Sequence, residues 1–316
     1  MTLKIYFQDI LLLLDNKFCK VYIMMVLKDM VNNNLINLII IMVILGFCEA
    51  GLRILGGRDA LKDEFPFAIS LEHRYTKIIN GKTKFKYRRF CTGAALTPSW
   101  ILTAAHCDDE DILKNYNKLI TSYPKKFARY NSHYPKEPGY LSPITEVFVY
   151  PGYCLNDKAQ PKFDIALYKT ENVIVSQYGK ISAIDFMSLI GHETFLLGFG
   201  RTNGSSTERP LQVLNVILIN CDLRDSQGLV GVLCVVPRCG LKATSCGGDS
   251  GGPLVHSSGI VGVLTGGWGV CNNFDMVLHP GRASSVISMI SHAIDWMSNI
   301  IANKTNGDSK ERFGSH

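Results

Sequence analysis

The sequence lacks a hydrophobic run long enough to cross a lipid bilayer comfortably. Its apolar run from Leu35 to Cys48 is shorter than the roughly 20 residues that a membrane-spanning helix needs. The cysteine spacings match no zinc-binding pattern, so a structural metal site is not expected. Extensive disorder is excluded as well, because 47% of the 316 residues are hydrophobic and charges of both signs are mixed. A chain of this length can form one large domain or two small ones.

Residues 1–50 have the features of a secretory signal region. The apolar run ends at Cys48-Glu-Ala50, which places small side chains at the first and third positions before a cut after Ala50. Met24, Met25 and Met30 are alternative start residues, preceded by an extended N-terminus. A signal anchor that tethers the protein to a membrane is the alternative interpretation. Cleavage after Ala50 leaves residues 51–53 as a short propeptide, and we expect a secreted, extracellular protein.

Ten cysteines in an exported chain indicate disulfide bonds, which form in oxidising compartments. Cys19 and Cys48 lie in the segment that is removed, so eight of the ten remain. N-glycosylation motifs begin at Asn203 and Asn303, which fits an exported chain. The sequence therefore predicts a disulfide-bonded glycoprotein.

Three motifs provide the groups for acyl transfer in the order His, Asp, Ser. T-A-A-H-C contains His106, F-D-I-A-L contains Asp164, and G-G-D-S-G-G-P contains Ser250. A serine hydroxyl is a weak nucleophile, so it needs a base to accept its proton and a carboxylate to orient that base. G-D-S-G-G also fits the elbow of α/β-hydrolases, but there the other two groups follow the serine and a sheet with alternating helices precedes it. The short β-like runs before Ser250 contradict that fold, and we expect these three residues to be catalytic.

These motifs resemble those of the trypsin- and chymotrypsin-like serine peptidases. The resemblance extends from Arg53, which begins R-I-L-G-G, to about Ile301, and includes the string from Phe90 to Cys107 and G-F-G-R-T from Gly198. It implies an all-β fold of two six-stranded antiparallel β-barrels, with the active site between them and a C-terminal amphipathic helix. It also implies a secreted serine endopeptidase made as a zymogen, with no cofactor and no metal. The alternative is a non-catalytic homologue that uses the fold for binding.

The resemblance and the local patterns together place the domain boundaries. We expect a peptidase domain at 54–302, with barrel one at about 54–170, barrel two at about 177–283, a helix at about 285–302 and a mobile polar tail at 303–316. Short β-branched or aromatic runs bounded by turn residues fit the barrels. The helix is indicated by apolar residues spaced three and four apart, at Ile287, Ile290, Ile294, Met297 and Ile301.

The resemblance assigns roles to further residues. The backbone N–H groups of Gly248 and Ser250 would form the oxyanion hole, and the Thr265 hydroxyl would hydrogen-bond Asp164. A separate trypsin-like peptidase would cut after Arg53, and the freed Ile54 ammonium would pair with Asp249. The implied disulfides are Cys91–Cys107, Cys221–Cys234 and Cys246–Cys271, which leaves the pairing of Cys154 and Cys239 open.

The specificity pocket departs from the trypsin pattern. Thr244 stands at its base, where trypsins have aspartate, so a large hydrophobic side chain is expected before the scissile bond. Gly267 and Gly281 match the glycines of the pocket walls, while Gly266 replaces the usual tryptophan and the loop after Cys271 is lengthened. Asp275 in this loop is the residue that would instead give trypsin-like specificity.

The segment from Arg74 to Phe90 contains basic residues and no acidic ones. In a strand, alternate residues share a face, so four cations would lie together, namely Lys82, Lys84, Lys86 and Arg88. A solvated hairpin face and an exosite for acidic substrates or sulfated glycans are the two interpretations. Other expected partners are protein or peptide substrates and protein inhibitors, but not nucleic acid.

Overall fold

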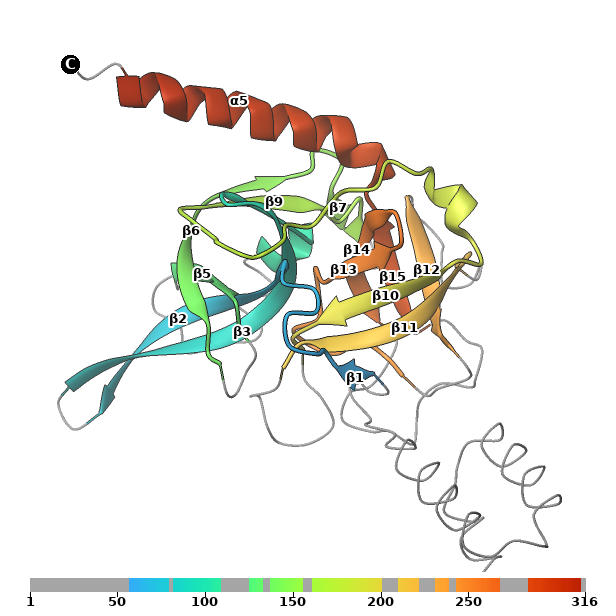
Figure 1. Ribbon diagram of the computed structural model, residues 1–316, viewed down its shortest axis with the longest axis horizontal. Helices are drawn as coiled ribbons and strands as arrows, with labels where there is room; N and C mark the ends of the chain where they lie inside the picture. Colours follow the sequence, from blue (N-terminus) through green and yellow to red (C-terminus); the bar gives the residue numbers. More distant parts are fainter. Residues whose placement is uncertain are drawn as a thin grey trace, which may run out of the picture. The chain divides into compact units, whose positions relative to one another are not determined.

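The protein divides into two units, Met1–Ala50 and Gly51–His316, and a computed structural model describes residues of the second (Figure 1). The described residues are 57–79, 82–108, 125–132, 137–155, 161–200, 210–221, 231–238, 243–267 and 284–313. The predicted signal region and the start of the peptidase domain therefore lie outside them. Within the described ranges, no helix is both long enough and apolar enough to cross a membrane.

Six antiparallel strands form the first closed barrel. They are β2 (Ala68–Ile79), β3 (Lys82–Thr97), β4 (Trp100–Thr103), β5 (Lys125–Tyr130), β6 (Tyr140–Val149) and β9 (Ala166–Thr170), in the spatial order β2-β3-β4-β9-β6-β5. Aliphatic side chains on the inner faces of the strands, such as Ile69, Leu71 and Ile101, are fully buried together with Tyr168. The short strands β4 and β9 are almost completely buried on both faces, whereas the first half of β3 is mostly exposed.

Six further strands form the second barrel. They are β10 (Glu193–Gly198), β11 (Gln212–Ile219), β12 (Val232–Pro237), β13 (Pro253–His256), β14 (Gly259–Gly267) and β15 (Ser285–Met289). A seven-stranded sheet runs β1-β11-β10-β13-β14-β15-β12, and an additional β11–β12 pairing closes six of its strands into a barrel. β1 (Arg58–Asp59) extends β11 at the edge. The predicted all-β fold of two six-stranded barrels is confirmed.

An apolar cluster joins the two barrels. It includes Trp100 and Ile165 from the first barrel, Leu197 and Val213 from the second, and Met297 from the C-terminal helix. Burial of such side chains stabilises a fold by roughly 1.5–3 kcal/mol each. This contact fixes the ends of the strands that carry the predicted site residues.

The C-terminal helix begins later than predicted and also ends later. α5 spans Ile294–Phe313, after a short 3-10 turn η5 (Ser291–Ala293), whereas Ser285–Met289 is strand β15. Ile287 fits the helical spacing, but it pairs with Leu233 of β12 and Leu264 of β14, so barrel closure decides its conformation. The predicted polar tail is helical as far as Phe313.

Contacts with the first barrel explain why the helix continues into the polar segment. Lys304 Nζ donates to Glu146 Oε2 at 2.7 Å, and its ammonium lies 5.1 Å from the Phe148 ring centroid. Trp296 packs edge-on against Tyr150 at 5.3 Å between ring centroids. Figure 1 shows α5 above β6 and β9 of the first barrel. The spacing of hydrophobic residues in the sequence does not indicate these contacts, which hold α5 on the first barrel.

Candidate active site

His106 and Asp164 are brought together by two short segments of the first barrel. His106 lies in the 3-10 turn η1 (Ala105–Asp108) that follows β4, and Asp164 lies between the short strand β8 (Pro161–Lys162) and β9. The Asp164 Oδ2 is 2.6 Å from His106 Nδ1, and its Oδ1 accepts the His106 backbone N–H at 2.8 Å. The Asp164 side chain is fully buried, while His106 keeps 14% exposure. A carboxylate can only accept, so the Nδ1 atom of His106 carries the proton.

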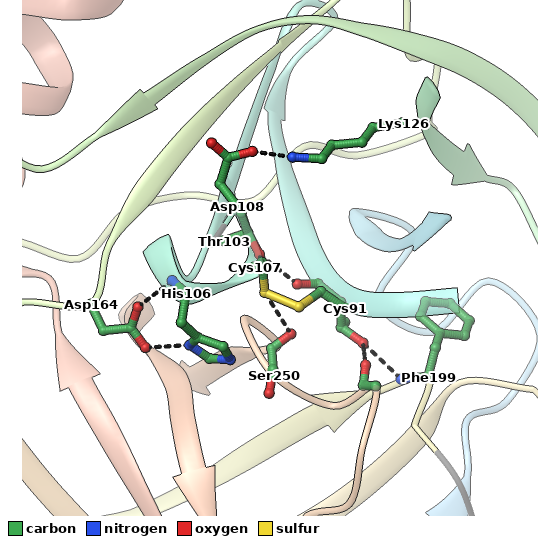
Figure 2. The surroundings of a disulfide bond; sticks show 11 residues. Cys91, Thr103, His106, Cys107, Asp108, Lys126, Asp164, Phe199 and Ser250 are labelled. Carbon is green, nitrogen blue, oxygen red and sulfur yellow. Dashed lines mark hydrogen bonds and ion pairs between the residues drawn. A yellow bond between two sulfur atoms is a disulfide. The ribbon is translucent and has the colours of Figure 1, made fainter. Parts of the chain in front are cut away.

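The second barrel places Ser250 beside this pair. Ser250 is half-buried and follows Gly248, whose φ is +101°, in a turn between β12 and β13. Its carbonyl oxygen accepts the Thr92 backbone N–H at 2.8 Å and lies 3.8 Å from Cys107 Sγ, next to His106 in the chain. In Figure 2 the His106 ring and Ser250 lie on the same side of the Cys91–Cys107 disulfide.

Gly251 is required by the packing of this turn. Its φ is +74°, and a Cβ atom there would lie 2.1 Å from Thr103 Oγ1 and 2.5 Å from the Thr92 carbonyl oxygen. A side chain at this position would therefore push the turn away from β3 and β4. The glycine-rich motif allows the nucleophile turn to approach the first barrel closely.

The Asp249 side chain is buried and accepts hydrogen bonds from two backbone N–H groups. Its Oδ1 accepts the Gly200 N–H at 2.6 Å, and its Oδ2 accepts the Cys246 N–H at 2.8 Å. Burial raises the Asp249 pKa to about 6, although the two backbone hydrogen bonds act in the opposite direction. A Cβ atom on Gly198 or Gly200 would lie 2.0 or 2.4 Å from this carboxyl group, so both positions need glycine. The predicted activation residues Arg53 and Ile54 lie outside the described residues.

The described part of the predicted specificity pocket carries hydroxyl groups and no charge. Thr244 is fully buried, and its Oγ1 donates to the Ser284 carbonyl at 3.2 Å. Gly267 pairs with Ser285 across β14 and β15, and the Ser285 and Ser245 hydroxyls lie 2.9 Å apart. Ser285 was not predicted for the pocket, since only the strand register places it opposite Gly267.

Other predicted pocket residues fall on the part of the chain that is not described. Gly281, Asp275 and the lengthened loop after Cys271 all lie within residues 268–283. Gly266 is described, and a Cβ atom there would meet nothing within 4 Å. The missing tryptophan therefore leaves open space on this wall among the described residues.

The expected hydrogen bond from Thr265 to Asp164 is absent. Thr265 Oγ1 is buried without a hydrogen-bond partner among the described atoms. Asp164 is instead tied to the second barrel by its backbone N–H, which donates to Ser288 Oγ at 3.0 Å. Sequence reasoning missed Ser288 because its partner lies more than a hundred residues away, although it stands in the strand that follows the predicted pocket.

Two of the predicted disulfides are present, Cys91–Cys107 and Cys221–Cys234. Cys246 is also disulfide-bonded, while its predicted partner Cys271 lies outside the described residues. Cys154 is a free, exposed cysteine, and Cys239 is not described.

No thiolate is left for a metal beside His106. The sulfur atoms of Cys91 and Cys107 and a His106 ring nitrogen lie within 4.8 Å of one another. Both sulfurs belong to a disulfide, whereas a metal-binding cysteine must be a thiolate. Of the predicted glycosylation sites, Asn303 is exposed on α5 and Asn203 is not described.

Comparisons with known proteins agree with this geometry. The Trypsin family model matches residues 54–290. The chain belongs to the trypsin family. Tryptase from Mus musculus is 27% identical over 270 residues, which cover 77% of this chain and 87% of that protein. Trypsin from Xenopus laevis is 28% identical over 262 residues, which cover 79% of this chain and 91% of that protein.

The fold of a solved serine protease structure is similar too. Neuropsin, a serine protease expressed in the limbic system of mouse brain, superimposes with a TM-score of 0.57 at 19% identity, covering 78% of this chain and 98% of that one. This likeness agrees with the fold, while the Trypsin family model confirms the family predicted from the motifs, and the protein is a serine endopeptidase of that family.

Proposed function

We propose that this trypsin-family protein is secreted as a zymogen and cleaves peptide bonds through an acyl-enzyme formed on Ser250. The observation that carries the proposal is the buried Asp164 carboxylate, which holds both the Nδ1 and the backbone N–H of His106. This arrangement leaves Nε2 of His106 unprotonated and able to accept a proton from a serine hydroxyl.

The reaction proceeds in two halves. Ser250 Oγ attacks the scissile carbonyl carbon while His106 accepts the hydroxyl proton, and His106 then gives that proton to the leaving amine. A water molecule attacks the acyl-enzyme with the same base, and the carboxylic acid product leaves Ser250 free. The backbone N–H groups of Gly248 and Ser250 bind the oxyanion, a role in which one donor contributes about 3–4 kcal/mol.

Activation follows cleavage after Arg53 by a separate trypsin-like peptidase. In the uncut chain, Asp249 is buried with backbone N–H donors as its described partners and a raised pKa. A freed Ile54 ammonium is the cation that this carboxylate needs, because a buried charge is costly until it is paired. Pairing would fix the residues on both sides of Asp249, which include the two oxyanion donors.

The enzyme prefers large hydrophobic residues before the scissile bond. Thr244 supplies no charge at the pocket base, and its hydroxyl already donates to a backbone carbonyl. A lysine or arginine entering such a site loses hydration without gaining a partner. Trypsin-like specificity is the alternative, and it requires a carboxylate from Asp275.

The β2–β3 hairpin is a candidate exosite for acidic substrates or sulfated glycans. Lys82, Lys84, Lys86 and Arg88 are all exposed on β3. On the same face His73 is buried, and its pKa is lowered to about 4 by burial and by the charges of Lys126 and Arg88. Figure 1 shows this two-stranded ribbon extending past the barrel. Protein inhibitors would engage the site between the barrels.

Labelling with a fluorophosphonate tests the catalytic proposal. The chain is cut after Arg53 and treated with the probe, which reacts only with a serine activated by its base. We expect labelling of the cut chain and none of the Ser250→Ala or His106→Ala variants, with the uncut Arg53→Gln variant nearly unreactive. Absence of labelling in the cut, folded chain would instead favour a non-catalytic homologue.

A further inference from the structure

Thr92 of the first barrel contacts both ends of the Ser250 turn. Its backbone N–H donates to the Ser250 carbonyl at 2.8 Å, and its Oγ1 donates to the Gly248 carbonyl at 2.8 Å. The residue is fully buried on β3. The backbone and the side chain of one residue thus hold the two ends of the segment that presents the proposed oxyanion donors and the nucleophile.

The Thr92 hydroxyl is used as donor and as acceptor at once. Its Oγ1 also accepts the Phe199 N–H at 3.0 Å, and a hydroxyl offers one proton and two lone pairs for such a pair of bonds. The Thr92 carbonyl accepts from Thr103 Oγ1 at 2.8 Å, which fixes the residue from β4 as well. Valine would keep the shape of the side chain but leave two buried backbone groups without their partner.

The position of the Gly248 carbonyl bears on the orientation of the Gly248 N–H. Gly248 has a φ of +101°, and a glycine with few restraints has wide backbone freedom. A hydrogen bond to its carbonyl fixes the peptide plane between Gly248 and Asp249, and this limits the ψ angle that, together with φ, sets the direction of the Gly248 N–H. Electrostatic stabilisation of an oxyanion depends on donors that are already oriented.

Thr92 also connects the turn with the other parts of the site. It follows Cys91, whose disulfide partner Cys107 is adjacent to His106. Its acceptor bond to Phe199 lies next to Gly200, whose N–H donates to Asp249. Thr92 therefore bonds directly to the oxyanion turn and is linked through its neighbours in the chain to the base and to the proposed activation carboxylate.

We propose that the Thr92 hydroxyl is a positioning residue that holds the oxyanion turn and Ser250 in their productive geometry. The inference rests on the proposed function, because it concerns the rate of the same reaction. Its contribution falls on kcat, since the turn engages charge that develops in the transition state rather than in the bound substrate.

The test compares the cut parent with Thr92→Val, Thr92→Ser and the matched control Thr170→Val. Thr170 is a buried threonine at the far end of β9 whose hydroxyl donates to the Pro98 carbonyl at 3.3 Å. Displacement of reacting groups by about 1 Å can lower a rate 100-fold, so we expect Thr92→Val to lower kcat about 10- to 100-fold with KM changed less than about 3-fold. Thr92→Ser and Thr170→Val should both keep kcat within about 3-fold of the parent.

A peptide boronate gives a second readout, because its tetrahedral adduct occupies the oxyanion position. Its inhibition constant should rise in Thr92→Val by the same factor as kcat falls. Thr92→Ala replaces Thr92→Val in both measurements if the valine variant does not fold. Unchanged kcat in the variant, or equal loss in Thr92→Ser, would overturn the Thr92 proposal alone. A parent and a Thr170→Val variant that both fail to label with fluorophosphonate would overturn the proposed function.

Discussion

The carboxylate of Asp164 binds His106 at two atoms, the ring Nδ1 and the backbone nitrogen. Its Oδ2 lies 2.6 Å from the ring Nδ1 and its Oδ1 accepts the backbone N–H at 2.8 Å. The carboxylate is itself fully buried, so the imidazole has a defined orientation and a defined tautomer. General-base catalysis by Nε2 depends on both.

Replacing Asp164 with asparagine should therefore lower kcat by about 10⁴-fold while the protein stays folded. The amide can donate to Nδ1, which would stabilise the tautomer that has its proton on Nε2. Steady-state kinetics on a peptide substrate measure the effect. Asp185→Asn is the control, since Asp185 only caps the short 3-10 turn η2 (Phe186–Leu189) through the Met187 N–H. A loss below about 10-fold in Asp164→Asn would contradict the assigned role.

The uncut chain should become less stable as the pH rises through about 6, because of Asp249. Burial raises its pKa from 3.8 to about 6, so the folded state holds a proton that the unfolded state has already lost. This stabilising effect is fully present below the unfolded pKa and is lost as the pH rises through the folded pKa. The free energy of unfolding, measured by urea, should therefore be lower at about pH 7.5 than at about pH 5 by about 1.4 kcal/mol from Asp249.

Asp249→Asn isolates this contribution from that of His73. The His73 pKa is lowered to about 4 by burial and nearby cations, so its stabilising effect is present above 6.5 and is lost as the pH falls. The two residues thus act in opposite directions, and the difference between parent and variant is the quantity to compare. If the free energy of unfolding depends on pH in the same way in the parent and in Asp249→Asn, the Asp249 carboxyl group is not buried as described. Cutting after Arg53 should remove the difference, because the new ammonium lowers the Asp249 pKa.

The sequence predicted the residues that motifs carry and missed those that strand pairing supplies. His106, Asp164 and Ser250 each stand in a recognisable string, so their order could be read directly. Ser288 and Thr92 reach the site because β15 and β3 pass beside it. Their partners are distant in sequence, and no local pattern indicates the contact.

Local periodicity also misplaced one boundary for a physical reason. Ile287 has helical spacing to Ile290 and Ile294, yet it is β-branched and completes the barrel between β12 and β14. Both interpretations bury the same side chain, so hydrophobicity alone cannot separate them. The predicted hydrogen bond from Thr265 to Asp164 was wrong as well, because the position of a residue in the sequence does not determine where its hydroxyl group points.

If the basic face of the hairpin is an exosite, the full chain should bind heparin with strong salt dependence. Alanine at Lys82, Lys84, Lys86 and Arg88, all exposed, should abolish most of the retention. A control variant with the same loss of charge has alanine at four exposed positions outside the hairpin, Arg58, Lys62, Lys180 and Arg238. Salt gradients on a heparin column compare the three proteins. If both variants elute at the same salt concentration, the basic face of the hairpin is a solvated surface and not an exosite.

The last prediction concerns specificity and depends on Thr244. A phenylalanine or leucine side chain gains roughly 1.5–3 kcal/mol from burial in an uncharged pocket, whereas an arginine or lysine loses hydration there. The cut enzyme should therefore show higher kcat/KM for matched peptides ending in Phe or Leu than for those ending in Arg or Lys. Thr244→Asp should reverse this order by adding a carboxylate at the pocket base, and Thr244→Ser should leave it unchanged.

The outcome also decides how the zymogen is activated. With a hydrophobic preference the enzyme cannot cut efficiently after its own Arg53, so a separate trypsin-like peptidase is needed. If the parent prefers Arg or Lys, the neutral-pocket proposal and the need for an external activator both fail. Asp275→Asn then identifies the source of the charge, because loss of the Arg preference in that variant assigns the carboxylate to the loop rather than to the pocket base.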